Sequence, residues 1–193
     1  METGTEEIIR TIREDPFLSV MFSCYERAGE YAWDKNVLDY GCGYGWGSWW
    51  VAAWAREVTG YDPDRERIRF AQENFKSFKR ENLSFTWNVD ELEKGQYNMI
   101  CLFMVISYIE EKEAVLKQAV SCLAQSGTLW VSYKVKNGEE ELRELITDWV
   151  QKAGLKWIDS DERILSDTEI MRLDIFEKTE VRECECFMNG AGR

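Results

Sequence analysis

Glycines occupy every second position from Gly41 to Gly47, and acids stand on either side of this run. A residue without a Cβ readily takes a positive φ and lets a ligand lie against the backbone. Asp39 stands two residues before the first glycine, and Asp62 follows it by 62 − 41 = 21 residues. In nucleotide-binding α/β folds, an acid about 20 residues after the first glycine holds the ribose hydroxyls. The spacing therefore suggests a ligand that contains adenosine.

Each of these acids ends a short apolar run that is typical of a buried strand. Val37 and Leu38 precede Asp39, and the run VTGYD at 58–62 ends in Asp62. A strand, a glycine turn and a helix in succession form a ligand site at the carboxyl end of an open α/β sheet. The helix that follows the turn also offers unpaired backbone N–H groups. We therefore expect both acids at one edge of the sheet.

Two classes of adenosine ligand fit this arrangement, a dinucleotide and S-adenosylmethionine. The dinucleotide fingerprint requires a small residue three positions after its second glycine. Counting from Gly41 places Trp46 there, which is far too large, and counting from Gly43 places Ser48 there, which is tolerable but unusual. The segment 39–45 instead fits the pattern D-x-G-x-G-x-G, which favours S-adenosylmethionine.

With these motifs the sequence resembles the class I S-adenosylmethionine-dependent methyltransferases, in particular their small single-domain, type 11/12-like members. The segments 37–45 (VLDYGCGYG) and 58–62 (VTGYD) look like the first and second motifs of that family. The segment 81–92 (ENLSFTWNVDEL) looks like its third strand and the turn whose acid contacts adenine. Later segments, 95–111 and 124–133, look like its fourth and fifth strands, so that the resemblance covers roughly 36–178.

The resemblance implies S-adenosylmethionine as methyl donor, S-adenosylhomocysteine as product, and no metal. It implies that Asp39 and the turn backbone hold the methionine part, that Asp62 holds the ribose, and that Asp90 holds the adenine. The implied cofactor-binding residues are Asp39, Gly41, Cys42, Gly43, Gly45, Asp62 and Asp90. Simpler roles compete with these: Asp39 as a cap of the glycine turn, Asp62 as a helix cap, and Asp90 as a turn residue whose register Asn88 also fits.

Methyl transfer from a sulfonium requires the acceptor atom to be aligned with the methyl group and water to be excluded. The chain contains no histidine, which excludes a Ser-His-Asp triad and histidine-based proton transfer. The candidates near the methyl group are Tyr25, Ser107 and Tyr108, with Tyr133 and Lys134 as further possible bases. Tyr25 belongs to an N-terminal helix that we expect to cover the sheet; the alternative is that this helix also covers the active site and shapes the substrate pocket. Ser107 and Tyr108 can equally well only shape the pocket.

Composition limits the classes of partner. The net charge of −12 argues against a nucleic-acid surface, and the place of the amino-methylating N/D-P-P-Y/F motif reads VISY at 105–108. We therefore expect a small-molecule acceptor; an RNA or protein methyltransferase and a non-catalytic scaffold protein are the alternatives. No apolar run is long enough to span a membrane, and the acidic start lacks the features of a signal peptide. We infer a cytoplasmic protein without a membrane segment. A zinc site at Cys184 and Cys186 is a poor hypothesis without histidine or a second cysteine pair.

The expected architecture is a Rossmann-like, doubly wound α/β sheet with helices on both faces. It consists of five parallel strands and a C-terminal antiparallel hairpin. We expect one domain over 1–193, with N-terminal cap helices in 1–34, the core in 36–178 and a tail in 179–193. The expected helices span 5–13, 16–32, 111–123 and 138–153, and a further one begins at Pro63. After the first two strands, we expect strands at 83–87, 99–105 and 128–133. The hairpin consists of 156–165 and 168–176, with its turn at 166–167.

The helix after the glycine turn has two dissimilar faces. Small residues at Ser48, Val51, Ala52 and Ala55 predict close packing on the sheet, whereas Trp46, Trp50 and Trp54 fall on the opposite face. Exposed tryptophans of this kind often mark an interface. Either the N-terminal helices cover them, or our assignment of the faces is wrong, or they form the interface of a homodimer or with a partner protein.

Overall fold

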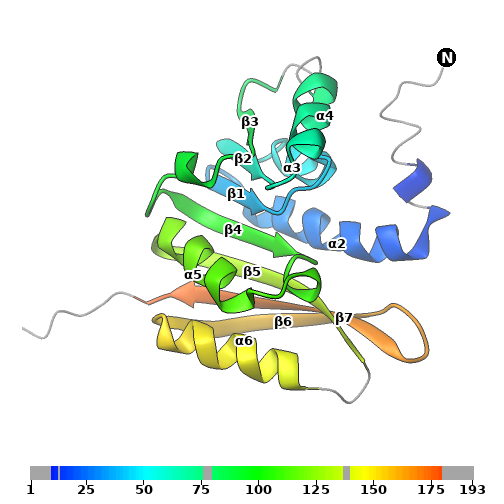
Figure 1. Ribbon diagram of the computed structural model, residues 1–193. Helices are drawn as coiled ribbons and strands as arrows, with labels where there is room; N and C mark the ends of the chain where they lie inside the picture. The colour runs from blue at the N-terminus through cyan, green and yellow to red at the C-terminus, as the bar shows by residue number, and fades with distance from the viewer. Residues whose placement is uncertain (1–9, 13, 76–79, 137–139, 180–193) are drawn as a thin grey trace, which may run out of the picture.

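The computed structural model describes residues 10–12, 14–75, 80–136 and 140–179 (Figure 1). They form a seven-stranded sheet in the order β3-β2-β1-β4-β5-β7-β6. The first five strands run parallel, and β7 runs antiparallel to both β5 and β6. The strands are β1 (Asn36–Tyr40), β2 (Glu57–Tyr61), β3 (Leu83–Thr86), β4 (Tyr97–Phe103), β5 (Leu123–Lys136), β6 (Leu155–Ile164) and β7 (Glu169–Lys178).

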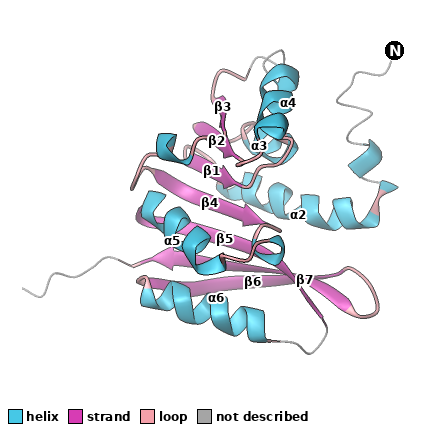
Figure 2. Ribbon diagram, viewed as in Figure 1, coloured by secondary structure: helices cyan, strands magenta, loops and turns pink. Residues whose placement is uncertain are grey.

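Helices cover both faces of this sheet, as the secondary-structure colouring in Figure 2 shows. One apolar cluster joins α2 and α3 to one face, and another joins α5 and α6 to the other face. The helices are α2 (Pro16–Tyr31), α3 (Trp46–Val51), α4 (Arg65–Phe75), α5 (Lys112–Cys122) and α6 (Glu141–Lys152), with 3-10 turns η2 (Val89–Glu91) and η3 (Ile106–Tyr108). The predicted fold class is confirmed.

The strand order reverses between β1 and β4, which pair in parallel with each other: β2 follows β1 on one side, and β5 follows β4 on the other. In open α/β sheets ligands bind at such a switch point, outside the carboxyl ends of the strands. The turn after β1 is the glycine run, so that the fold places this run at the switch point. Among the described residues no helix has the length and apolar character that crossing a membrane requires.

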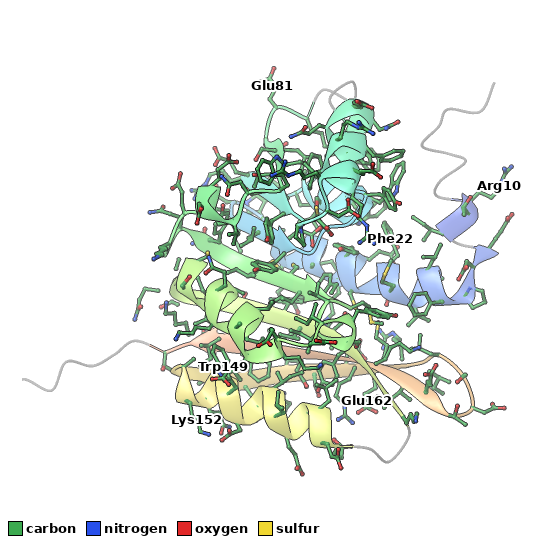
Figure 3. All side chains as sticks on the ribbon, viewed as in Figure 1. Arg10, Phe22, Glu81, Trp149, Lys152 and Glu162 are labelled. Atoms are coloured by element: carbon green, nitrogen blue, oxygen red, sulfur yellow. The ribbon has the colours of Figure 1, made fainter. Side chains whose placement is uncertain are left out.

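The helix α2 begins where local chemistry predicts. Asp15 accepts a hydrogen bond from the N–H of Leu18 at 3.0 Å, and Pro16 occupies the first helical position. Figure 3 shows the side chains of Phe22 on α2 and Trp149 on α6, which pack against opposite faces of the sheet. Most of the helix expected at 5–13 lies outside the described residues.

The expected faces of α3 are confirmed. Its small residues Ser48, Val51 and Ala52 and the following Ala55 are buried against the sheet. The tryptophans are covered in part: Phe22 of α2 lies 5.1 Å from Trp50, and Phe75 of α4 lies 4.6 Å from Trp46, between ring centroids. Trp54 remains 39% exposed. The neighbouring helices α2 and α4 therefore cover most of the tryptophan face of α3, and an interface at this face stays a prediction.

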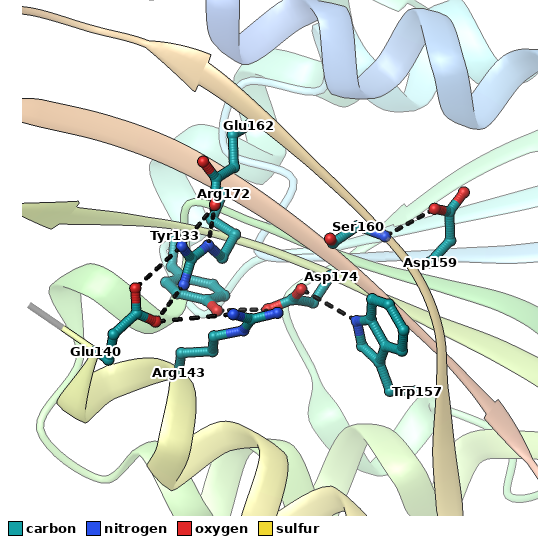
Figure 4. A network of polar contacts seen from close by, with 9 residues as sticks. All are labelled: Tyr133, Glu140, Arg143, Trp157, Asp159, Ser160, Glu162, Arg172 and Asp174. Atoms are coloured by element: carbon teal, nitrogen blue, oxygen red, sulfur yellow. Dashed lines mark hydrogen bonds and ion pairs between the residues drawn. The ribbon is translucent and has the colours of Figure 1, made fainter. Parts of the chain in front are cut away.

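The C-terminal hairpin forms as predicted, and β7 fills the place between β5 and β6. Its buried charges join three elements, as Figure 4 shows. The guanidinium of Arg172 on β7 contacts Glu140 at the start of α6 at 2.6 Å and Glu162 on β6 at 2.5 Å. Asp174, fully buried, accepts hydrogen bonds from the hydroxyl of Tyr133 and, at 3.3 Å, from the indole N–H of Trp157.

Candidate functional site

The turn between β1 and α3 is open where a ligand would need space. Gly41, Gly43 and Gly45 have φ values of +87°, +56° and +85°, which residues other than glycine rarely adopt. A Cβ on Gly43 would meet nothing within 4 Å, whereas one on Gly41 would lie 2.3 Å from Cγ2 of Val105. The turn thus presents bare backbone at Gly43, and Val105 lies directly against its first glycine.

The carboxylate of Asp62 holds this turn to the end of β2. Its Oδ2 accepts the N–H of Gly43 at 2.9 Å, and its Oδ1 accepts the N–H of Asp64 at 2.9 Å. Arg67 Nη1 lies 3.7 Å from Oδ2. Asp64 caps α4, because its Oδ1 accepts the N–H of Glu66 at 2.9 Å. The role of helix cap therefore belongs to Asp64, and Asp62 joins the glycine turn to the neighbouring strand.

Asp39 faces the interior of the protein. Its Oδ2 accepts the hydroxyl of Ser48 at 2.6 Å and its Oδ1 accepts that of Tyr25 at 3.3 Å. Burial raises the pKa of this carboxyl from 3.8 to about 7, although the two hydrogen bonds oppose the change. The structure therefore places Asp39 beneath the turn, held by two side chains of the protein. Contact with the methionine part of a cofactor stays a prediction.

Tyr25 lies in the same buried layer. Its ring occupies the space next to Gly47, where a Cβ would lie only 2.1 Å from the ring carbons. Phe103 of β4 packs edge-on against it, with 4.8 Å between centroids. Burial and the neighbouring Asp39 raise the pKa of the Tyr25 hydroxyl. Tyr25 is thus a packing partner of the turn, not a side chain exposed at its outer surface.

The ends of β2 and β3 lie side by side. The N–H of Asp62 donates to the carbonyl of Thr86 at 3.3 Å. Two residues further on, Asn88 caps η2, and its Oδ1 accepts the N–H of Asp90 at 3.2 Å. Asp90 is exposed and Asn88 is half-buried. The fold therefore brings the Asp62 and Asp90 positions to the ends of adjacent strands, and Asn88 orients the turn between them.

A segment after β4 connects the glycine turn to a separate cavity. Met104 has a φ of +63°, Val105 lies on Gly41, and η3 follows. Ser107 Oγ accepts the backbone N–H of Lys134 at 2.9 Å, which joins η3 to β5. Beside it is a cavity of about 360 Å³, lined by Ser107, Tyr108, Lys112, Lys134, Val135, Lys136, Glu141, Leu142 and Glu169.

The candidate bases divide between this cavity and the interior. Tyr108 is 68% exposed, and the Lys134 ammonium pairs with Glu169 at 3.1 Å. The hydroxyl of Tyr133, in contrast, is buried under α6 and donates to Asp174, and burial raises its pKa. Ser107, Tyr108 and Lys134 therefore line the cavity, whereas the fold places Tyr25 and Tyr133 away from it.

The sequence did not identify three residues that the structure places next to the site. Val105 lies on the glycine turn, Arg67 pairs with Asp62, and the guanidinium carbon of Arg65 lies 3.7 Å from the ring centroid of Trp87. The Cys42 thiol is buried with a raised pKa. Among the described residues, no group of three or more histidine, cysteine, aspartate or glutamate side chains is placed to hold a metal ion.

Residues 19–165 match the family described as "Methyltransferase domain". The structure is similar to the N-methyltransferase NodS from Bradyrhizobium japonicum WM9 in complex with S-adenosyl-L-homocysteine (TM-score 0.69, 17% identity, 88% of this chain and 91% of that chain). It is also similar to the [4+2]-cyclase SpnF (0.70, 14%, 82% and 81%) and to M. jannaschii TYW2 in complex with AdoMet (0.64, 16%, 80% and 74%). At these identities the structural likeness concerns the fold alone.

Proposed function

The chain belongs to the methyltransferase domain family, and from this premise we propose that it transfers a methyl group from S-adenosylmethionine to a small-molecule acceptor. The observation that carries the proposal is the bare backbone at Gly43, held by the buried carboxylate of Asp62 at the switch point of the sheet. This combination of a cradle and an anion suits a ribose and the chain attached to it. The bound donor supplies a methyl group already activated by the positive charge of its sulfur.

The residues present fit such a donor. Asp62 would hold the ribose, because each carboxylate oxygen that accepts one backbone N–H keeps a second lone pair. The Gly41–Gly45 backbone, including Cys42, would hold the methionine part, and Asp90 the adenine. Asp39 would act from beneath the turn, through Ser48 and Tyr25. Two similar folds, those of NodS and TYW2, were solved with S-adenosylhomocysteine and AdoMet respectively.

The acceptor would occupy the cavity at the carboxyl ends of β4 and β5. Its volume of about 360 Å³ falls within the range of pockets for small molecules. The segment 104–108 links it to the glycine turn, because Val105 contacts Gly41 while Ser107 and Tyr108 line the cavity. This continuity would place an acceptor next to the methyl group. Aligning the acceptor and excluding water would then be the main contribution of the protein to the rate.

Any proton released by the acceptor would pass to the carboxylate of Glu169, which lines the cavity, or directly to water, because the Lys134 ammonium and the Tyr108 hydroxyl are proton donors. Both side chains line the cavity, and Lys134 pairs with Glu169. Tyr25 and Tyr133 are buried, and their hydroxyls donate hydrogen bonds to Asp39 and Asp174 respectively. We therefore assign neither tyrosine a role in proton transfer. An acceptor atom that is already unprotonated would need no base at all.

We also propose a cytoplasmic protein that acts as one domain without nucleic-acid partners. Four cysteines, Cys24, Cys42, Cys101 and Cys122, are free and buried, which is typical of a reducing compartment. The net charge of −12 opposes binding to a phosphate backbone. The partly exposed Trp54 face of α3 would serve a homodimer or a partner protein.

Calorimetric titration of the purified protein with S-adenosylhomocysteine tests this proposal. We expect binding of one molecule per chain, and a rise in the unfolding temperature with ligand concentration, since a ligand that binds only the native state stabilises it. S-adenosylmethionine should compete for the same site. Absence of both the binding heat and the thermal shift would refute the proposed function.

A further inference from the structure

The cavity beside η3 has a charge opposite to that of the whole protein. Its lining includes three lysines, Lys112, Lys134 and Lys136, and two glutamates, Glu141 and Glu169, whereas the chain has a net charge of −12. The acids next to Lys112 in the chain line a different cavity, of about 920 Å³, together with residues of α5 and α6. That cavity has equal numbers of acidic and basic residues, and another of about 680 Å³ has three acids and one arginine. The cavity beside η3 is therefore a locally positive site in an acidic protein.

The three lysines differ in how far their ammonium groups are already engaged. Lys134 pairs with Glu169 at 3.1 Å. The Nζ of Lys112 donates to the carbonyl of Ile109 at 2.6 Å, which fixes its place and leaves it two further N–H groups. Lys136 is exposed and forms no ion pair with any residue that the structure describes. Lys112 and Lys136 thus keep donors for an anion.

The rest of the lining supplies one more donor and an apolar surface. The Oγ of Ser107 accepts the N–H of Lys134, so that its own hydrogen is left to donate, and it donates to no described residue. Val135, Leu142 and Tyr108 line the same cavity. Small-molecule sites typically combine an apolar wall with a few polar groups. A ligand with one anionic group and a compact apolar body matches this lining.

We propose that the acceptor carries a carboxylate and that Lys112 and Lys136 bind it, with the Ser107 hydroxyl as a further donor. The inference rests on the proposed function, because it takes this cavity as the acceptor site. A carboxylate adds one negative charge, which balances the excess of one lysine over the glutamates, and its hydrogen bonds to ammonium groups are charge-assisted. A phosphate group offers similar oxygens, but its second charge would meet Glu141 and Glu169, and like charges repel.

Probes that share an apolar body and differ in the polar group test this specificity. Phenylacetate carries the carboxylate, phenylacetamide is its neutral counterpart, and phenyl phosphate carries the larger charge. Each is titrated by ¹⁵N NMR into the protein with and without S-adenosylhomocysteine, and shifts of the Ser107, Lys134 and Val135 amides locate the probe. We expect phenylacetate to bind at least about fivefold more tightly than phenylacetamide, because hydrogen bonds to charged groups are the stronger ones.

Two substitutions should change the affinity for phenylacetate in opposite directions. K136Q should weaken it by about threefold, as expected for an exposed charge. E169Q should strengthen it by about threefold, since it releases the Lys134 ammonium from its partner. Neither should change the affinity for phenylacetamide, whereas a general disturbance of the cavity would alter both. K117Q is the matched control, because Lys117 lies on α5 like Lys112 but lines only the 920 Å³ cavity of the two.

The outcomes separate this inference from the proposed function. If the protein binds S-adenosylhomocysteine but binds phenylacetate no better than phenylacetamide, or no better than K136Q does, the carboxylate site is refuted and the proposed function stands. Tighter binding of phenyl phosphate, or shifts away from the cavity, would likewise overturn the inference. If phenylacetate binds with the expected pattern but S-adenosylhomocysteine does not bind, the anion site stands and methyl transfer falls. If neither binds, both proposals fall together.

Discussion

Asp62 and Asp39 end neighbouring strands, yet their surroundings give them different chemistry. Asp62 accepts backbone N–H groups from the glycine turn and from Asp64, and each of its oxygens keeps a lone pair for a further donor. Asp39 is enclosed by Tyr25 and Ser48, and its burial raises its pKa to about 7. The first acid is therefore suited to hold ligand hydroxyls, and the second to respond to pH.

Replacement of Asp62 by alanine should weaken S-adenosylhomocysteine binding by at least about tenfold, because hydrogen bonds to a charged group contribute about 1.5–3 kcal/mol each. Asp64→Ala is the matched control, since Asp64 lies in the same loop but caps α4. That variant should lose about 1 kcal/mol of stability and keep its affinity. Equal affinities of the two variants in calorimetry would contradict the ribose-binding role.

Asp39 should make the stability of the fold depend on pH. Its folded pKa of about 7 lies above its ordinary value of 3.8, so that between these values the native state keeps a proton that the unfolded chain releases. The free energy of unfolding should therefore fall as pH rises from about 4 to about 7, by an amount on the order of a few kcal/mol. Asp39→Asn should lack this decrease.

Urea unfolding of the parent and of Asp39→Asn at pH 5 and pH 8 measures the difference. The asparagine side chain can still accept a hydrogen bond from Ser48 or Tyr25, so that packing is kept. Other titrating groups contribute equally to both proteins and cancel in the comparison. An identical pH dependence in the two proteins would show that Asp39 does not carry this effect.

At the scale of elements, α2 supports the glycine turn through one close contact. The ring of Tyr25 occupies the space beside Gly47 of α3, where a Cβ would lie 2.1 Å from it. In an ordinary helix the change from glycine to alanine stabilises by roughly 1 kcal/mol. Here Gly47→Ala should instead destabilise the protein by about 1–3 kcal/mol, because the added methyl group forces the two helices apart.

A double-mutant cycle in urea unfolding tests whether the Tyr25 ring causes this loss of stability. In a Tyr25→Ala background the space is vacant, and Gly47→Ala should be neutral or stabilising there. Gly95→Ala is the control, since Gly95 has a φ of +69° and no neighbour of its Cβ position within 4 Å. Its cost should be the same in both backgrounds. A Gly47→Ala cost that persists without the tyrosine ring would rule out the contact.

The buried Asp174 of β7 links the hairpin to Tyr133 of β5, in addition to the backbone pairing of these two strands. Asp174→Ala would leave the hydroxyl of Tyr133 and the indole N–H of Trp157 without their acceptor. We expect a loss of about 3 kcal/mol in urea unfolding. Tyr133→Phe removes only one donor and should cost about 1 kcal/mol. A larger loss for Tyr133→Phe than for Asp174→Ala would show that packing of the ring, not the polar network, joins these elements.

Local signals predicted some elements well and failed where tertiary contacts decide. The Asp15–Pro16 pair gave the start of α2, because capping depends on adjacent residues only. The strand β5 starts at Leu123, not at 128, because α5 continues directly into it and Leu123 pairs with Tyr97. The register of β5 against β4 shifts between the pairs Tyr97–Leu123 and Met99–Thr128, and Ser126, in this irregular stretch, has a φ of +57°.

The same reasoning explains what the site argument found and missed. The spacing of glycines and acids located the switch point, and the structure adds that Asp62 accepts the N–H of Gly43 in the turn. One of the two partners of Asp39, in contrast, is Tyr25, which belongs to the N-terminal helix α2. Strand alternation puts Asp39 on the same face as Val37, which packs in the cluster with α2 and α3, but no local pattern identifies the hydroxyl that contacts the Asp39 carboxyl.

At the scale of the whole molecule, the resemblance to class I methyltransferases is confirmed by the family match and by the order of the seven strands. Strand order brings residues from β1, β2, β3 and β4 to one edge. A fold of this kind hosts unrelated activities, and the similar structure of a [4+2]-cyclase illustrates this. The function must therefore be tested at the site itself.

A crystal structure of the protein with S-adenosylhomocysteine tests the central claim most directly. The account predicts ribose hydroxyls within hydrogen-bond distance of the Asp62 carboxylate and the amino-acid part against the backbone of Gly43. A nucleoside bound elsewhere, or a Gly43 backbone with no ligand beside it, would contradict the account.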